Sequence, residues 1–210
     1  MPDVTLQNDA DPAPPAGPVL TALDGRSIVL VGMMGVGKSS VGRRLAVRLS
    51  IPFVDADSEI EIAAKMTIPE IFARHGEPYF RSGEARVIAR LLEGGPQVLA
   101  TGGGAFMNSD TRAAIKVKGV SIWLSAEFDL LMRRINKRKN DRPMLLTADP
   151  AATLRQLLTE REPVYAQADI TVQSQEVPHD AIVAEIVRAL AGFLNTRAPP
   201  AAEDGVKDGE

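Results

Sequence analysis

Residues 28–40, IVLVGMMGVGKSS, decide the fold of this chain. The stretch begins with a β-branched, apolar run that is typical of a buried strand. It continues with a match to G-x-x-x-x-G-K-[ST], the pattern of a phosphate-binding P-loop. The residues that follow place Val41, Leu45 and Leu49 on one face of a helix. Strand, loop and amphipathic helix in this order predict a nucleotide-binding loop rather than a glycine-rich turn without a chemical role.

The residue types of this loop suit a bound nucleotide. Glycines allow the backbone to curl its N–H groups around an anion, and the following helix adds the positive end of its dipole. Lys38 supplies a charge for the β- and γ-phosphates, and the Ser39 hydroxyl can bind Mg²⁺. The nucleotide-binding residues that we predict in this loop are Gly35, Val36, Gly37, Lys38, Ser39 and Ser40.

The composition is ordinary for a globular protein of about one domain. The chain has 210 residues, 45% hydrophobic and 24% charged, and it has no cysteine, which excludes disulfides and thiolate chemistry. No apolar run approaches the ~20 residues that span a bilayer, so we expect no membrane segment. The N-terminus is acidic, with no basic residue before Arg26, unlike a signal or transit peptide, and we expect a cytoplasmic enzyme.

The two ends of the chain differ from its middle. Residues 1–24, rich in Pro, Ala and Asp, and residues 196–210 are expected to be disordered tails around one domain at 25–195. The tails carry charges of −4 and −2, so the domain carries +3 although the net charge is −3. A mildly basic domain suits a small polyanionic ligand, and its charge is too small to indicate nucleic acid.

Strand-like and helix-like segments alternate inside this domain. The alternation predicts an α/β protein with three layers, in which helices cover both faces of a five-stranded parallel sheet. The expected strands are 28–31, 52–55, 97–101, 120–124 and 168–172. After the P-loop helix, further helices are expected at 58–66, 69–74, 78–93, 108–116, 127–136, 150–160 and 179–194, and the helix at 150–160 could continue to 165. Ligands of such sheets bind beyond the carboxyl ends of the strands, so we expect the site residues at those positions.

Two carboxylates follow the second expected strand. In an extended segment, Asp55 and Asp57 project to the same side. The carboxylate nearer Ser39 could help to hold Mg²⁺, and the other could accept a proton from a substrate hydroxyl. Helix capping by Asp57 is the alternative interpretation. The presence of the P-loop favours the functional one.

Two arginines on expected helices and a run of glycines after the third expected strand are further candidates. Arg81 and Glu84 are spaced to pair on one helix face, which would aim the arginine at a carboxylate ligand; a surface ion pair is the alternative. The glycines at 102–104 follow the third strand and expose bare backbone to a ligand, although a turn could do the same. Arg161 near a helix end is either a binding residue or a partner of the helix dipole.

A basic segment covers residues 133–142 and ends in Arg142-Pro143. Such a run is usually a solvated surface. Within a nucleotide-binding fold it could instead be a lid, at about 137–149, that closes over ATP and places an arginine on the transferred phosphoryl group. Arg142 is the candidate for that arginine.

Together these motifs resemble the shikimate kinase family. The resemblance rests on the P-loop, Asp-x-Asp, Phe-Arg, the Gly-Gly-Gly turn, the basic segment and Arg-x-Pro-x-Tyr, and it covers nearly all of residues 26–173. It implies a P-loop kinase with a lid. It further implies ATP-dependent phosphorylation of the 3-hydroxyl of shikimate, a step of chorismate and aromatic amino-acid biosynthesis.

The resemblance also implies a role for each matching residue. Lys38 and Ser39 would serve ATP and Mg²⁺, with Asp55 assisting the metal, and Asp57 would hold the shikimate hydroxyls as a base or as an orienting group. The residues that would bind shikimate besides Asp57 are Arg81, Gly102, Gly103, Gly104 and Arg161, with Glu84 orienting Arg81. Arg142 would lie near the phosphates and Arg138 against the adenine. The implied partners are ATP and shikimate, with no nucleic acid or membrane, and the implied state is a monomer.

Other P-loop proteins are the alternatives. A gluconate kinase shares the fold and takes a hydroxylated carboxylate, and a nucleoside monophosphate kinase takes AMP or CMP. A switch GTPase would carry Asn-Lys-x-Asp, whereas the chain has Asn-Lys-Arg-Lys at 136–139. A homologue without activity is disfavoured because every expected polar residue is present.

Overall fold

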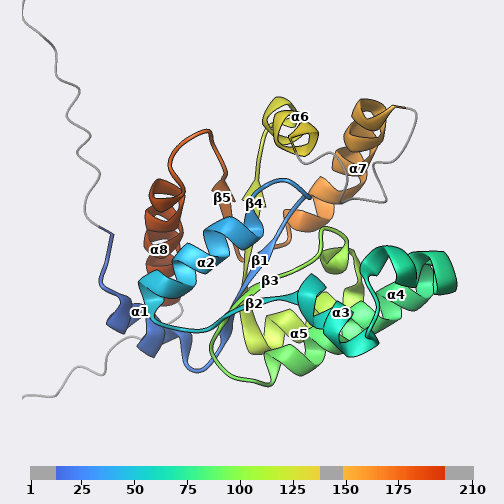
Figure 1. Cartoon of the computed structure of the whole chain (residues 1–210). Helices are drawn as coiled ribbons and strands as arrows, with labels where there is room; N and C mark the ends of the chain where they lie inside the picture. The colour runs from blue at the N-terminus through green and yellow to red at the C-terminus, as the bar shows by residue number, and fades with distance from the viewer. Residues whose placement is uncertain (1–12, 138–148, 197–210) are drawn as a thin grey trace, which may run out of the picture.

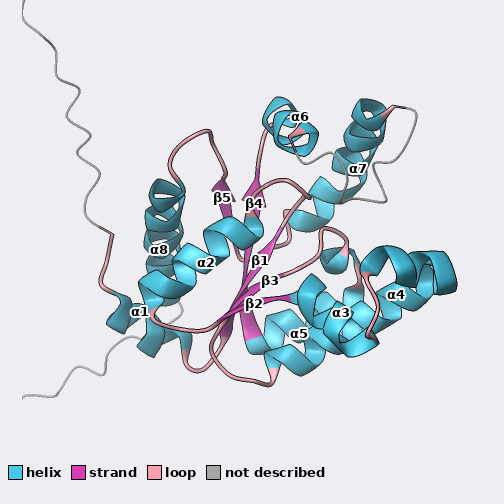
Figure 2. Ribbon diagram, in the orientation of Figure 1, coloured by secondary structure: helices cyan, strands magenta, loops and turns pink. Residues whose placement is uncertain are grey.

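The computed structural model describes residues 13–137 and 149–196. Its centre is a parallel sheet of five strands in the order β2-β3-β1-β4-β5 (Figure 2). The strands are β1 (Ser27–Val31), β2 (Phe53–Asp55), β3 (Val98–Ala100), β4 (Gly119–Ser125) and β5 (Ile170–Gln173). Each overlaps a predicted strand, and the predicted α/β fold class is confirmed.

Helices cover both faces of this sheet (Figure 1). On one face, three helices contact one another: α1 (Ala16–Leu23), α2 (Lys38–Leu49) and α8 (His179–Asn195). Towards the other face lie α3 (Ala56–Ala64), α4 (Ile68–Leu92), the short 3₁₀ helix η1 (Ala105–Met107) and α5 (Ser109–Lys118). Beyond one end of the sheet, two further helices contact each other: α6 (Phe128–Asn136) and α7 (Pro150–Tyr165).

The central strand β1 is buried on both faces of the sheet. All five of its residues are buried, and it pairs with β3 through Val29 and Leu99 and with β4 through Val29 and Ser121. A strand with neighbours on both sides and helices on both faces needs apolar residues at successive positions, as the run at 28–31 provides. Because all the strands are parallel, their carboxyl ends meet at one edge of the sheet.

The P-loop connects β1 to α2 at this edge. Gly37 is the N-cap of α2 and has φ 105°, a left-handed conformation that a side chain disfavours. Helix α2 begins at Lys38 and has no acidic residue in its first turn. The positive end of the helix dipole therefore lies at this edge of the sheet, and no carboxylate in the first turn of α2 neutralises it.

Helix α4 contains a break that separates two predicted helices. Gly76 has φ 77° and ψ 173°, so the segments expected at 69–74 and 78–93 are joined through one non-helical residue. A capping box formed by Thr67 and Glu70 fixes the start of α4. The half after the break carries Arg81 and Glu84.

The prediction of a disordered tail at 1–24 is wrong for residues 16–23. They form α1, in which Val19 and Leu23 are buried against the hydrophobic core, beside α2 and α8. The segment lacks the apolar content to fold alone, but packing against two existing helices supplies the missing burial. Residues 1–12 and most of the predicted C-terminal tail lie outside the described residues.

Helices long and apolar enough to cross a bilayer were sought in the described part of the chain, and none occurs there. Arg138, Arg142 and nearly all of the predicted lid lie outside the described residues.

Candidate active site

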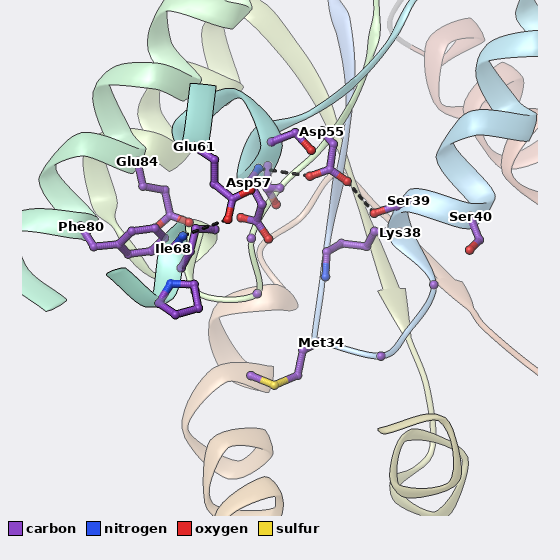
Figure 3. Close-up of a pocket in the computed structure, with 18 of the residues that line it drawn as sticks. Met34, Lys38, Ser39, Ser40, Asp55, Asp57, Glu61, Ile68, Phe80 and Glu84 are labelled. Carbon is purple, nitrogen blue, oxygen red and sulfur yellow. Dashed lines mark hydrogen bonds between the residues drawn. The ribbon is translucent and has the colours of Figure 1, made fainter. Parts of the chain in front are cut away.

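A cavity of about 610 Å³ lies beyond the carboxyl ends of β1, β2 and β3. It is lined by the P-loop, by the residues that follow β2 and β3, and by parts of α4 and α7 (Figure 3). The predicted site residues that line it are Gly35, Gly37, Lys38, Ser39, Ser40, Asp55, Asp57, Arg81, Glu84, Gly102, Gly103, Gly104 and Arg161. Val36 is the exception among the described ones, because its side chain is buried and its carbonyl faces Arg134 and Ser174.

Lys38 reaches back along the P-loop from the start of α2. Its Nζ donates to the carbonyl oxygens of Gly32 at 2.7 Å and Met33 at 3.1 Å. The side chain lines the cavity although it is only 9% exposed. A buried ammonium held by backbone dipoles is a fixed positive charge at the loop that the sequence predicts to bind an anion.

Ser39 and Asp55 lie side by side on the wall of the cavity (Figure 3). Ser39 Oγ donates to Asp55 Oδ2 at 2.7 Å. A hydroxyl and a carboxylate are hard oxygen ligands that suit Mg²⁺, which usually takes one or two protein ligands and completes its shell with water and phosphate. The described residues contain no group of three or more acidic or histidine side chains that could hold a metal ion.

Asp57 reaches the cavity by a different geometry from the one expected. Helix α3 begins at Ala56, so Asp57 lies in a helical turn and not in an extended segment. Asp55 is the N-cap: its Oδ1 accepts from Asp57 N at 3.1 Å while its Oδ2 accepts from Ser39. Capping therefore belongs to Asp55 rather than Asp57, and both carboxylates line the same cavity as Lys38 (Figure 3).

Arg81 and Glu84 form the pair that their spacing predicts. Arg81 Nη1 donates to Glu84 Oε2 at 2.8 Å, and Arg81 Nε and Nη2 donate to Glu77 Oε1 at 3.1 and 3.0 Å. Glu84 is 2% exposed, and its other oxygen, Oε1, has no hydrogen-bond partner among the described residues. Burial raises the pKa of Glu84 above its usual value, although Arg81 opposes the shift. A carboxylate on each side holds the guanidinium in one orientation.

The glycine turn at 102–104 packs against Arg81. A Cβ added at Gly104 would lie 2.6 Å from the guanidinium carbon of Arg81, so only glycine allows this approach. The carbonyl oxygens of Gly102 and Gly104 accept from the N–H groups of Ala105 and Met107. The turn thus presents backbone directly to the cavity beside the arginine.

Arg161 approaches the same turn from α7. Its Nη1 donates to the Gly103 carbonyl oxygen at 3.3 Å, and its side chain lines the cavity at 7% exposure. Arg81 and Arg161 are 80 residues apart in sequence and lie on different helices. The structure brings both of them to one glycine turn. Two guanidinium groups beside one glycine turn are suited to a carboxylate.

Three basic residues line the cavity without having been predicted as site residues: Arg134, Lys137 and His179. Arg134 donates to Val36 O at 3.0 Å, Ser174 Oγ at 2.9 Å and Gln175 O at 3.0 Å. It therefore joins the P-loop to the segment between β5 and α8. Burial lowers the pKa of Arg134 from its ordinary value. The basic run did include Arg134, but a charge count does not show which member turns inward.

These features define a class of protein: a P-loop kinase whose acceptor is a small molecule. A family model described as shikimate kinase matches residues 34–191. The shikimate kinases of Bradyrhizobium diazoefficiens and Rhodopseudomonas palustris are 64% and 59% identical to the chain, and each match covers 90% of this chain and 92% of the relative. The structure of shikimate kinase from Acinetobacter baumannii in complex with shikimate has a TM-score of 0.77 at 36% identity, and the match covers 85% of this chain and 99% of that one.

The chain belongs to the shikimate kinase family. It is an enzyme of the shikimate pathway, and it phosphorylates shikimate with ATP as the donor.

Proposed function

We propose that the cavity is the site of this reaction and that its residues divide into a phosphate-binding half and an acceptor-binding half. The observation that carries the proposal is that one cavity is lined by Lys38 and Ser39 and also by Asp57, Arg81 and Arg161. A triphosphate in the P-loop and a small carboxylate on the two arginines would then be neighbours. This arrangement meets the main demand of phosphoryl transfer, which is the positioning of donor and acceptor.

Each half has its own task in the proposed mechanism. Arg81, Arg161 and the glycine turn bind the carboxylate of shikimate. Asp57 accepts a hydrogen bond from the 3-hydroxyl and takes its proton as the bond to phosphorus forms. Lys38 neutralises charge on the transferred phosphoryl group, whose transition state is loose and gains most from such charges.

We propose that Mg²⁺ binds with ATP at Ser39 and Asp55. The support is the pairing of these two oxygen ligands at 2.7 Å on the cavity wall. When bound, the metal would neutralise phosphate charge and hold the triphosphate in one orientation. Gly35, Gly37 and Ser40 would contact the phosphates, and Val36 would hold the loop through its carbonyl. Arg138 on the adenine and Arg142 on the phosphates remain proposals outside the described residues.

We further propose that one domain at 25–195 carries the activity and works as a cytoplasmic monomer. In support of the domain bounds, the residues that line the cavity run from Met34 to His179 and all lie within that range. Size-exclusion chromatography with light scattering tests the monomer directly. A dimer that persists on dilution would contradict it.

The decisive assay is ADP release by the purified enzyme with ATP and a panel of acceptors. We expect turnover with shikimate and background rates with gluconate, AMP and CMP, because only a small cyclic alcohol with a carboxylate satisfies Asp57 and both arginines. Equal turnover with gluconate would contradict the proposed acceptor site. Lys38→Ala serves as the inactive control.

A further inference from the structure

Tyr165 is a buried polar residue whose hydroxyl the reaction does not use. It ends α7, and its side chain is 1% exposed, with the ring stacked on Trp123 at 6.0 Å between centroids. Its hydroxyl donates to the carbonyl oxygen of Gly103. The sequence motif Arg-x-Pro-x-Tyr includes this residue, but the roles proposed above leave it without a function.

Two residues of α7 share one acceptor on the glycine turn. Tyr165 and Arg161 are one helical turn apart, and both donate to the Gly103 carbonyl, with Arg161 Nη1 at 3.3 Å. The Tyr165 hydroxyl and the Arg161 guanidinium therefore meet at Gly103, which lines the cavity where we propose that shikimate binds. A displacement of the Gly103 carbonyl would move its partner Arg161 as well.

Gly103 also lies close to the P-loop. A Cβ added to Gly103 would lie 3.3 Å from Met34 N and 3.8 Å from both Gly32 O and Arg161 Nη1. Gly103 is thus confined between the phosphate loop and α7, and the hydroxyl of Tyr165 is one of the groups that hold it there. A phenylalanine would fill the same space but would leave the carbonyl with Arg161 as its side-chain partner.

We propose that Tyr165 is a positioning residue of the acceptor site, which holds Gly103 and Arg161 where they meet the carboxylate of shikimate. The proposal rests on the proposed roles of Gly103 and Arg161. Burial raises the pKa of Tyr165 to about 12, so its hydroxyl keeps its proton and remains a donor at all physiological pH values.

The chain offers a matched control, because Tyr79 is its only other tyrosine and is 51% exposed on α4. We expect Tyr165→Phe to raise the KM for shikimate about three- to tenfold, the range for one neutral hydrogen bond. The KM for ATP should stay within about twofold, because the hydroxyl that is removed bonds to the glycine turn and not to the phosphate loop. Tyr79→Phe should change neither constant.

The Arg161→Ala variant and the Arg161→Ala/Tyr165→Phe double variant distinguish the proposed acceptor site from the proposed positioning role of Tyr165. If Arg161→Ala leaves the KM for shikimate unchanged, the proposed acceptor site itself is wrong. If Arg161→Ala raises that KM and Tyr165→Phe does not, the positioning role is overturned. A supporting result also requires that the two changes together cost less than the product of their separate effects, as for residues acting through one contact.

A second measurement does not depend on the stability of Tyr165→Phe. In the Tyr79→Phe background, biosynthetic fluorotyrosine labels Tyr165 alone and gives one ¹⁹F resonance. We expect this resonance to shift when shikimate is added without nucleotide, because ligand binding at Gly103 changes the hydrogen bond that Tyr165 makes. An unchanged resonance at saturating shikimate, or equal rises in both KM values for Tyr165→Phe, would overturn the proposal.

Discussion

Arg81 Nη1 lies 2.8 Å from Glu84 Oε2, one helical turn further along α4, and this pair lines the acceptor side of the cavity. Glu84 is almost fully buried, whereas Glu77, which also pairs with Arg81, is half exposed. The two carboxylates therefore differ in how strongly they can hold the arginine. A charge pair is worth more when water is excluded from it.

We predict that Glu84→Gln raises the KM for shikimate by roughly tenfold, since a hydrogen bond between charged groups contributes about 1.5–3 kcal/mol. The melting temperature should not fall, because burial of the Glu84 charge is unfavourable and raises its pKa. Steady-state kinetics and thermal unfolding measure the two effects. Glu77→Gln is the matched control, and an equal rise in KM for both variants would argue against the special role of Glu84.

The contact between Ser39 and Asp55 predicts a defect in metal dependence. Asp55→Asn should raise the Mg²⁺ concentration for half-maximal activity by about tenfold, the lower range for residues that orient or hold a metal. Asparagine caps helices as well as aspartate does, so α3 should remain stable. The rate is measured against Mg²⁺ at fixed ATP. Asp110→Asn, a change in the first turn of α5, should leave the curve in place.

Arg134 predicts a selective effect on the nucleotide. Its removal leaves the Val36 carbonyl of the P-loop with Ser174 Oγ as a side-chain partner and takes away the bonds to Ser174 Oγ and Gln175 O. Arg134→Ala should therefore raise the KM for ATP roughly tenfold. The KM for shikimate should change little. Arg133→Ala removes a neighbouring arginine whose partner is the exposed Glu176, and it should be close to wild type. A larger rise for shikimate than for ATP would contradict this assignment.

Tyr165 predicts a loss of stability in alkali. Its pKa is raised from 10.0 to about 12 in the folded protein, so the unfolded chain loses this proton first. The contribution to the free energy of unfolding is present below pH 10 and is lost as the pH rises towards 12, by about 2–3 kcal/mol for a shift of this size. Denaturant titrations across this range should show a shallower loss in Tyr165→Phe than in Tyr79→Phe. Parallel curves would contradict the raised pKa.

The sequence predicted the fold well because its patterns are local. The buried run at 28–31 and the P-loop determine the central strand and the helix after it, and alternation then implies the parallel sheet. Helix α1 was missed because its burial comes from packing against α2 and against α8, the last helix of the fold, which lies far away in sequence. Local composition cannot show that two such helices will cover Val19 and Leu23.

The candidate site shows a similar division between local and distant information. Motif positions located Lys38, Asp55, Arg81 and Arg161, all of which line one cavity. The geometry around Asp57 differed, because Asp55 caps α3 and the helix begins two residues earlier than expected. Arg134 and Tyr165 were not assigned roles, since their partners lie 98 and 62 residues away in sequence.

Our central claim is that one cavity contains both the phosphate-binding loop and the two arginines, Arg81 and Arg161, that bind the carboxylate of shikimate. The KM for shikimate of the Arg81→Ala variant tests this claim most directly. Arg86→Ala is the matched control, since that arginine is exposed on the same helix. We predict that Arg81→Ala raises the KM for shikimate by about a hundredfold, as for loss of a charged hydrogen-bonding partner. The KM for ATP should remain within about twofold, and Arg86→Ala should match wild type. An unchanged KM for shikimate in folded Arg81→Ala would contradict the claim.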